Sequence, residues 1–145
     1  SIPLFFAVLG AITLANLPDR PADLATSKRT VAVIFGPKAA TVIVSCCIAV
    51  AALSAVPIFH STLNSRRMWA AGSIIVVLHA CALLRALIGL LRSGAYDRRV
   101  DNVRPLALSH IIWLGAIPLV SFLWRYSKFP TRNLVISFSP RSNFI

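Results

Sequence analysis

Residues 39 to 59 read AATVIVSCCIAVAALSAVPIF, and this stretch decides the fold class because it contains no charged side chain. An α-helix of about 20 residues is about 30 Å long, which matches the hydrocarbon core of a bilayer. Three more apolar stretches, at 2–17, 68–91 and 106–124, have the same character, although the first is slightly short for a full span. The sequence therefore predicts an all-α polytopic transmembrane bundle of about four helices.

The composition excludes an ordinary soluble domain. Of the 145 residues, 57% are hydrophobic and only 13% are charged, and the mean hydropathy is +0.78, whereas soluble domains carry about 25% charged residues. The formal net charge of +11 does not indicate nucleic acid, because the basic residues fall between the apolar stretches instead of clustering on one face. We expect the lipid bilayer as partner and no nucleic acid.

The apolar stretches divide the chain into a transmembrane half-domain, 1–126, and a basic C-terminal tail, 127–145, which is expected to be unstructured or interfacial. Short connections are expected at 18–38, 60–67 and 92–105. If the crossings alternate, the side that holds 18–38 and 92–105 has slightly more Lys and Arg, which places the 18–38 loop in the cytoplasm. Because the chain opens inside an apolar run, we expect its first helix to be longer in a parent protein; a removed initiator Met is the alternative.

The connection at 18–38 contains DRPADLATSKRTVAVIFG, residues 19–36. Asp19 and Asp23 stand four positions apart, so a helical turn would place both carboxylates on one face. Two such carboxylates repel each other unless a cation lies between them, and Mg²⁺ is commonly held by one or two carboxylates together with substrate phosphates. Lys28, Arg29 and Thr30 follow and can bind phosphate oxygens. The stretch therefore predicts a diphosphate site at a membrane surface; from the residues alone, a solvated connection is the alternative.

This stretch resembles the second aspartate-rich motif of the UbiA superfamily of intramembrane prenyltransferases. Asp19 and Asp23 match the two aspartates of the family motif, and Lys28 and Arg29 match the basic residues near its end. Ser27 stands where the family usually has Gly. The resemblance implies the C-terminal half of a nine-helix fold, with Mg²⁺ bound by Asp19 and Asp23. The first motif of the family is missing, and the only other acidic pair, Asp97 and Asp101, is expected to lie in a solvated loop.

The resemblance implies Mg²⁺-dependent transfer of a prenyl group from a prenyl diphosphate to an aromatic or other small lipophilic acceptor, such as a quinone precursor. Asp19 and Asp23 are the expected catalytic residues, and Lys28 and Arg29 the expected diphosphate-binding residues. Two alternatives stay open: a UbiA-type terpene cyclase, and a non-catalytic truncated membrane protein. Because the first motif is missing, the isolated chain is expected to be an incomplete part of the enzyme and inactive.

Several residues inside the apolar stretches receive structural interpretations. The three thiols Cys46, Cys47 and Cys81 are expected to be reduced and to pack, and His79 to be a hydrogen-bonded packing residue. Arg85 is expected either to extend toward the membrane interface or to line a cavity. Aromatic residues near the span ends are expected to be interfacial anchors, and two prolines to end or kink their helices: Trp69, Trp124, Tyr126, Pro57 and Pro118.

Overall fold

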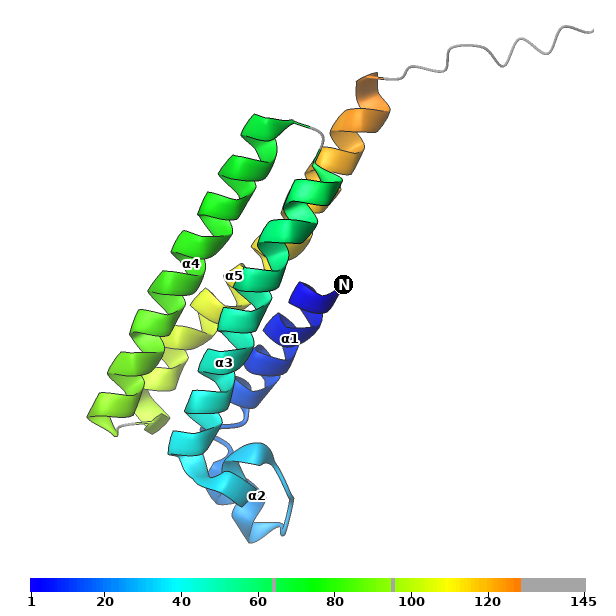
Figure 1. Cartoon of the computed structure of the whole chain (residues 1–145). Coiled ribbons are helices and arrows are strands. Elements are labelled where there is room, and N and C mark those ends of the chain that lie inside the picture. Colours follow the sequence, from blue (N-terminus) through cyan, green and yellow to red (C-terminus); the bar gives the residue numbers. More distant parts are fainter. Residues whose placement is uncertain (64, 95, 129–145) are drawn as a thin grey trace, which may run out of the picture.

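The structure, a computed structural model, describes residues 1–63, 65–94 and 96–128. This described part is helical and contains no strand, which confirms the all-α part of the predicted fold class (Figure 1). The elements are α1 (Ile2–Ala15), α2 (Arg20–Ala25), α3 (Val31–Thr62), α4 (Arg66–Ser93) and α5 (Tyr96–Lys128). Residues 129–145, most of the predicted tail, lie outside the described residues.

Three helical segments are long and apolar enough to cross a membrane, namely Val31–Thr62, Arg66–Ser93 and Val100–Trp124. The fourth apolar helix, α1, has only 14 residues and falls short of this length. The outward faces of the long helices are apolar as well: Leu53 is 73% exposed and Leu78 is 65% exposed. Such exposure suits a lipid environment, where the surroundings of a helix are as apolar as its own side chains.

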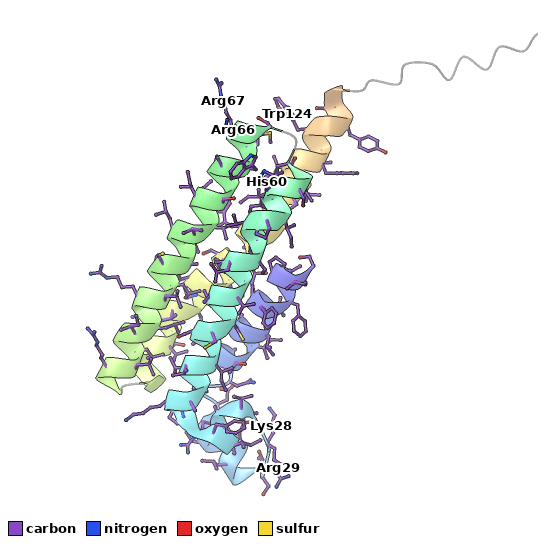
Figure 2. All side chains as sticks on the ribbon, in the orientation of Figure 1. Lys28, Arg29, His60, Arg66, Arg67 and Trp124 are labelled. Carbon is purple, nitrogen blue, oxygen red and sulfur yellow. The ribbon has the colours of Figure 1, made fainter. Side chains whose placement is uncertain are left out.

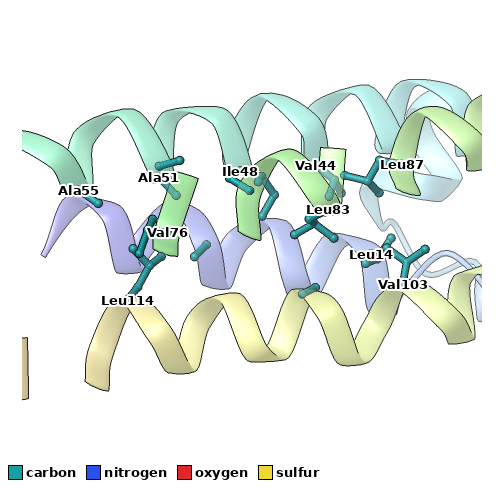
Figure 3. Packing of buried hydrophobic residues seen from close by; sticks show 14 of the residues in the cluster. Leu14, Val44, Ile48, Ala51, Ala55, Val76, Leu83, Leu87, Val103 and Leu114 are labelled. Atoms are coloured by element: carbon teal, nitrogen blue, oxygen red, sulfur yellow. The ribbon is translucent and has the colours of Figure 1, made fainter. Parts of the chain in front are cut away.

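The three long helices and α1 form a ring in which α1 and α4 lie on opposite sides. α1 packs against α3 and α5, and α4 packs against the same two helices (Figure 1). Each helix turns a stripe spaced by three or four residues toward the centre, which is the period of one helix face. On α3 this stripe includes Val44, Ile48, Ala51 and Ala55 (Figure 3).

Small residues allow close approach between the helices. Ala51, Ala55 and Ala80 are buried, whereas Ala82 faces outward. Gly72 of α4 lies so close to α5 that an added Cβ would be 3.0 Å from Cγ2 of Ile117. Close packing of helix backbones stabilises membrane bundles through van der Waals contacts. The hydrophobic effect does not hold such helices together, because the surrounding lipid is as apolar as their side chains.

Arg104 of α5 joins the last helix to the first. Its Nη2 donates a hydrogen bond of 3.0 Å to the carbonyl of Ala15 at the end of α1, and Nη1 lies 3.2 Å from Asp101 Oδ1. The final carbonyls of a helix have no partner within the helix. A cation at this position therefore satisfies a carbonyl group and also complements the negative end of the helix dipole.

The prediction of a loop at 92–105 is wrong. α4 ends at Gly94, which adopts a left-handed conformation with φ of 65°, and α5 already begins at Tyr96. The helix continues through Pro105 because Val100 and Val103 are buried in the core on the same face. Polar composition predicted a loop here, but burial of one apolar stripe determines the helix. Asp101 is exposed as expected, whereas the side chain of Asp97 lies outside the described residues.

The start of α3 differs from expectation, and of the two effects expected of the prolines, ending a helix is not observed. Helices α3 and α5 continue past Pro57 and Pro118, so neither proline ends its helix. The break in α3 lies instead at Gly36, with φ of 83° and ψ of 165°, directly before Pro37. α3 begins at Val31, which is eight residues before the predicted start at 39, so the last part of the quoted motif is helical.

Candidate functional site

The two predicted metal ligands lie on one short helix but in different surroundings. Asp19 is the N-cap residue of α2, and the backbone N–H of Asp23 donates to the Asp19 carbonyl at 2.8 Å. This is the four-residue helical spacing that the sequence predicts. However, Asp19 is exposed to solvent, whereas Asp23 is only 5% exposed.

The Asp23 carboxylate is held on one side only. Its Oδ1 lies 3.3 Å from Lys28 Nζ, and the backbone N–H of Lys28 donates to the Asp23 carbonyl at 2.8 Å. Oδ2 of the same carboxylate is buried, and no hydrogen-bond donor reaches it within the described part of the chain. A buried anionic oxygen without a partner is unfavourable, so Oδ2 is an acceptor site for a cation or a donor from a ligand.

Ser27 gives the turn between Asp23 and Lys28 its shape. Its φ of 56° makes it the one non-glycine residue with positive φ among those described. This backbone region favours Gly, because a Cβ crowds the following carbonyl there. The resemblance to the UbiA motif expects Gly at this same position, so the local conformation agrees with the expected residue type although the residue itself is Ser.

Arg29 is exposed, and it has no hydrogen bond or ion pair in the described ranges. Figure 2 shows Lys28 and Arg29 at the end of the molecule where α2 lies. Of the four predicted site residues, the structure therefore brings Asp23 and Lys28 into direct contact. Among the described residues, the side chains of Asp19 and Arg29 form no ion pair or hydrogen bond with that pair, although the Asp19 carbonyl accepts from the Asp23 backbone.

Sequence reasoning missed how two residues shape this segment. The Nε of Arg20 donates to the Ala32 carbonyl at 3.1 Å and thereby joins α2 to the first turn of α3. Thr30, the N-cap residue of α3, has a buried hydroxyl that no described group hydrogen-bonds. The sequence predicted that Thr30 binds phosphate but not that it caps α3, and Arg20 was treated only as a positive charge, because the bond from Arg20 to Ala32 does not follow from spacing.

Mg²⁺ is the expected partner of diphosphate at the two carboxylates of the motif. Among the described residues there is no group of three or more His, Cys, Asp or Glu side chains that could hold a metal. Asp23 Oδ2 and the Asp19 carboxylate nevertheless offer the hard oxygen ligands that Mg²⁺ prefers, and phosphate oxygens and water commonly complete its shell. A metal ion held jointly with a phosphate substrate is compatible with two carboxylates.

The comparisons add no relative. No protein-family model, no curated protein and no solved structure matches this chain. The function is therefore inferred from the motif residues and their geometry.

His79 of α4 lies beside Ser109 and His110 of α5. The Nε2 of His79 is 2.6 Å from Ser109 Oγ, so His79 is hydrogen-bonded as expected. Its ring stacks at 5.8 Å on that of His110, which is fully buried and whose ring nitrogens have no partner in the described structure. Arg85 is exposed, which favours its extension to the interface over a place in a cavity.

The three cysteines are all free thiols, as predicted, but only Cys47 packs inside the bundle. Cys46 and Cys81 are exposed on the outer face of their helices. The packing interpretation therefore holds for Cys47, whereas Cys46 and Cys81 face the surroundings of the bundle.

Proposed function

We propose that this chain forms part of a Mg²⁺-dependent membrane prenyltransferase that transfers a prenyl group from an isoprenoid diphosphate to an aromatic acceptor. The observation that carries the proposal is the buried Asp23 carboxylate, with one oxygen on Lys28 and the other free. It lies at the end of a bundle whose helices are long and apolar enough to span a membrane. The diphosphate of such a substrate would thus lie at the polar Asp23 site, and its prenyl chain would lie along the apolar bundle.

Each motif residue has a defined part in binding. Asp23 and Asp19 supply oxygen ligands for Mg²⁺, which when bound neutralises charge on the departing diphosphate. Lys28 now neutralises Asp23, and its side chain is 63% exposed, so its ammonium group can also contact a phosphate oxygen at the surface. Arg29, exposed and without another partner in the described structure, supplies a planar guanidinium that matches phosphate geometry.

The residues of this chain act on the diphosphate, and the acceptor is expected to enter from the apolar side. Stabilisation by charge is needed only where the diphosphate leaves, because that is where negative charge develops. This motif supplies only two carboxylates to hold the metal ion that stabilises this negative charge. We therefore infer that turnover needs a second carboxylate motif from outside residues 1–145, and that this chain alone binds substrate without turning it over.

A non-catalytic role is the second candidate, and the same ion pair favours it. Asp23 and Lys28 close the turn at Ser27, and a buried carboxylate that is paired within its own loop can serve structure alone. In that case Asp23 needs neither Mg²⁺ nor phosphate. The two functions differ in what replacement of Asp23 does to ligand binding.

The test is a titration of the purified chain with geranyl diphosphate, in Mg²⁺ and in EDTA. We expect EDTA or Asp23→Asn to weaken binding about tenfold or more, since a hydrogen bond or contact to a charged group contributes about 1.5–3 kcal/mol. Asp101→Asn is the matched control, because this exposed carboxylate pairs with Arg104 outside the motif. Binding that is equal in Mg²⁺ and EDTA, and unchanged in Asp23→Asn, would leave only the structural role.

A further inference from the structure

The end of the bundle opposite the motif has a different charge. There α3 ends at Thr62 and α4 begins at Arg66. Figure 2 shows His60, Arg66 and Arg67 together at this end, far from Lys28 and Arg29. The four acidic residues of the chain, at positions 19, 23, 97 and 101, all belong to segments near the other end (Figure 1).

The two arginines at this end are not neutralised within the described structure. Arg66 and Arg67 are exposed, and no described carboxylate forms an ion pair with either. The first turn of α4 contains no acidic residue. This end of the bundle therefore has uncompensated positive charge where an anion can reach it from outside.

Two hollows meet beside these arginines. The first, of about 480 Å³, is lined by His60, Arg66 and Trp69, among others. The imidazole of His60 lies edge-on to the Trp69 ring, with 5.1 Å between the ring centroids. Ser61 and Leu63 also line this hollow, which is therefore polar and basic on one side and aromatic on the other.

The second hollow is a groove of about 670 Å³ between the end of α3 and α5. Its lining is mainly apolar and includes Pro118, Leu119 and Phe122 of α5. Ser61 and Leu63 line both hollows, so the basic hollow and the apolar groove are neighbours that share one wall. A ligand that occupied both would have an anionic group at Arg66 and an apolar chain along α5.

We propose that this composite site binds an anionic phospholipid. Its phosphate would lie against Arg66, with Arg67 nearby, and one acyl chain would follow the groove toward Phe122. Charge complementarity selects an anionic head group, and the apolar groove selects an attached hydrocarbon chain over free phosphate. The position also fits, since Trp residues and basic side chains occur where a bilayer meets water, which is the depth of lipid phosphates.

The site is tested by quenching of Trp69 fluorescence in bilayer nanodiscs that contain brominated lipid. The chain carries Trp113→Phe and Trp124→Phe, so that Trp69 is the only tryptophan left. Brominated phosphatidylglycerol and brominated phosphatidylcholine are compared at equal mole fractions. We expect phosphatidylglycerol to quench Trp69 clearly more strongly, and Arg66→Gln/Arg67→Gln to reduce that quenching to the phosphatidylcholine level.

A matched control removes two other arginines from the same helix. Arg85→Gln/Arg92→Gln should retain the preference, because both side chains are exposed on the part of α4 away from the hollow. Equal quenching by the two lipids, or a preference that survives Arg66→Gln/Arg67→Gln, overturns the proposal. So does loss of the preference when inorganic phosphate is added at constant ionic strength, since the site would then bind free phosphate. Far-UV circular dichroism checks that every variant is folded.

Discussion

Ser27 adopts a backbone conformation that is unfavourable for its own residue type. The φ of 56° places Cβ close to the following carbonyl oxygen. The turn is nevertheless fixed, because Lys28 on its far side is hydrogen-bonded and ion-paired to Asp23. Strain at Ser27 is thus maintained by the contacts that shape the candidate site.

We predict that Ser27→Gly stabilises the protein by up to about 1 kcal/mol, because Gly adopts positive φ without steric cost. The measurement is reversible unfolding in mixed micelles of increasing dodecyl sulfate content. Ser54→Gly is the control: Ser54 lies in the middle of α3, where Gly costs about 1 kcal/mol relative to good helix formers. A loss of stability in Ser27→Gly would contradict the strain argument.

His110 offers a second residue-scale test, because its fully buried ring has no hydrogen-bond partner in the described structure. His110→Leu should raise the free energy of unfolding by about 1–3 kcal/mol, the cost of an unsatisfied buried polar group. His79→Leu should instead lower it by about 1 kcal/mol, since His79 is bonded to Ser109. The same micelle titration measures both, and destabilisation by His110→Leu would show that the ring has a partner.

At the residue scale, the sequence predicted which residues form the motif and how they are spaced better than it predicted their burial and contacts. The separation of Asp19 and Asp23 by one helical turn follows from position in the chain, and it is observed. The burial of Asp23 depends on how α2 is fastened to α3, which involves a bond between Arg20 and Ala32. No periodic pattern encodes such a contact between a side chain and a distant carbonyl.

At the element scale, the break at Gly36 sets where the motif stands relative to the bundle. Residues before the break are packed with α2, and those after it continue as the long apolar helix (Figure 1). The combination of φ 83° and ψ 165° is almost restricted to Gly. The backbone conformation at position 36 therefore requires glycine. Packing does not, since nothing lies within 4 Å of an added Cβ.

Gly36→Ala should therefore destabilise the protein by about 1–3 kcal/mol and weaken Mg²⁺-dependent binding of geranyl diphosphate. Gly89→Ala is the matched control, because Gly89 lies inside α4 and also has open space around it. There Ala should be neutral or stabilise by up to about 1 kcal/mol. Equal effects of the two substitutions would contradict the role assigned to the break.

The sequence located the apolar middle of each helix but not all of its ends. α4 was predicted at 68–91 and is found at Arg66–Ser93, because its ends coincide with a change from apolar to polar composition. α5 starts ten residues before its predicted start at 106, in a polar segment. Its first turns are stabilised by packing of Val100 and Val103 on the core, which composition averaged over the segment does not reveal.

At the scale of the whole molecule, the two ends of the bundle present different chemistry. The α2 end contains carboxylates and basic residues, whereas the turn between α3 and α4 is basic without acidic groups. α3 alone is long enough to place these ends on opposite sides of a membrane. The distribution of Lys and Arg favours the cytoplasm for the α2 end.

This arrangement predicts opposite labelling of two cysteines in sealed vesicles. In a background without the three native cysteines, Ala25→Cys and Ser61→Cys each place one thiol at an exposed position near one end. A membrane-impermeant maleimide added outside should label only one of them, and permeabilisation should expose the other. With right-side-out cell membranes, Ser61→Cys is the variant expected to react first. Labelling of both from one side would contradict a spanning α3.

The contact of Arg104 with Ala15 has a consequence for how the protein is made. The two residues are separated by 89 positions, so α1, α3 and α4 have all left the ribosome before the guanidinium is available. Until then the first helix packs on α3 alone, with one flank uncovered and its final carbonyl without this donor. α5 is therefore the helix that closes the ring between α1 and α4 in the described bundle. Before α5 is in place, α1, α3 and α4 form an open row with α3 in the middle, because α1 and α4 each pack on α3.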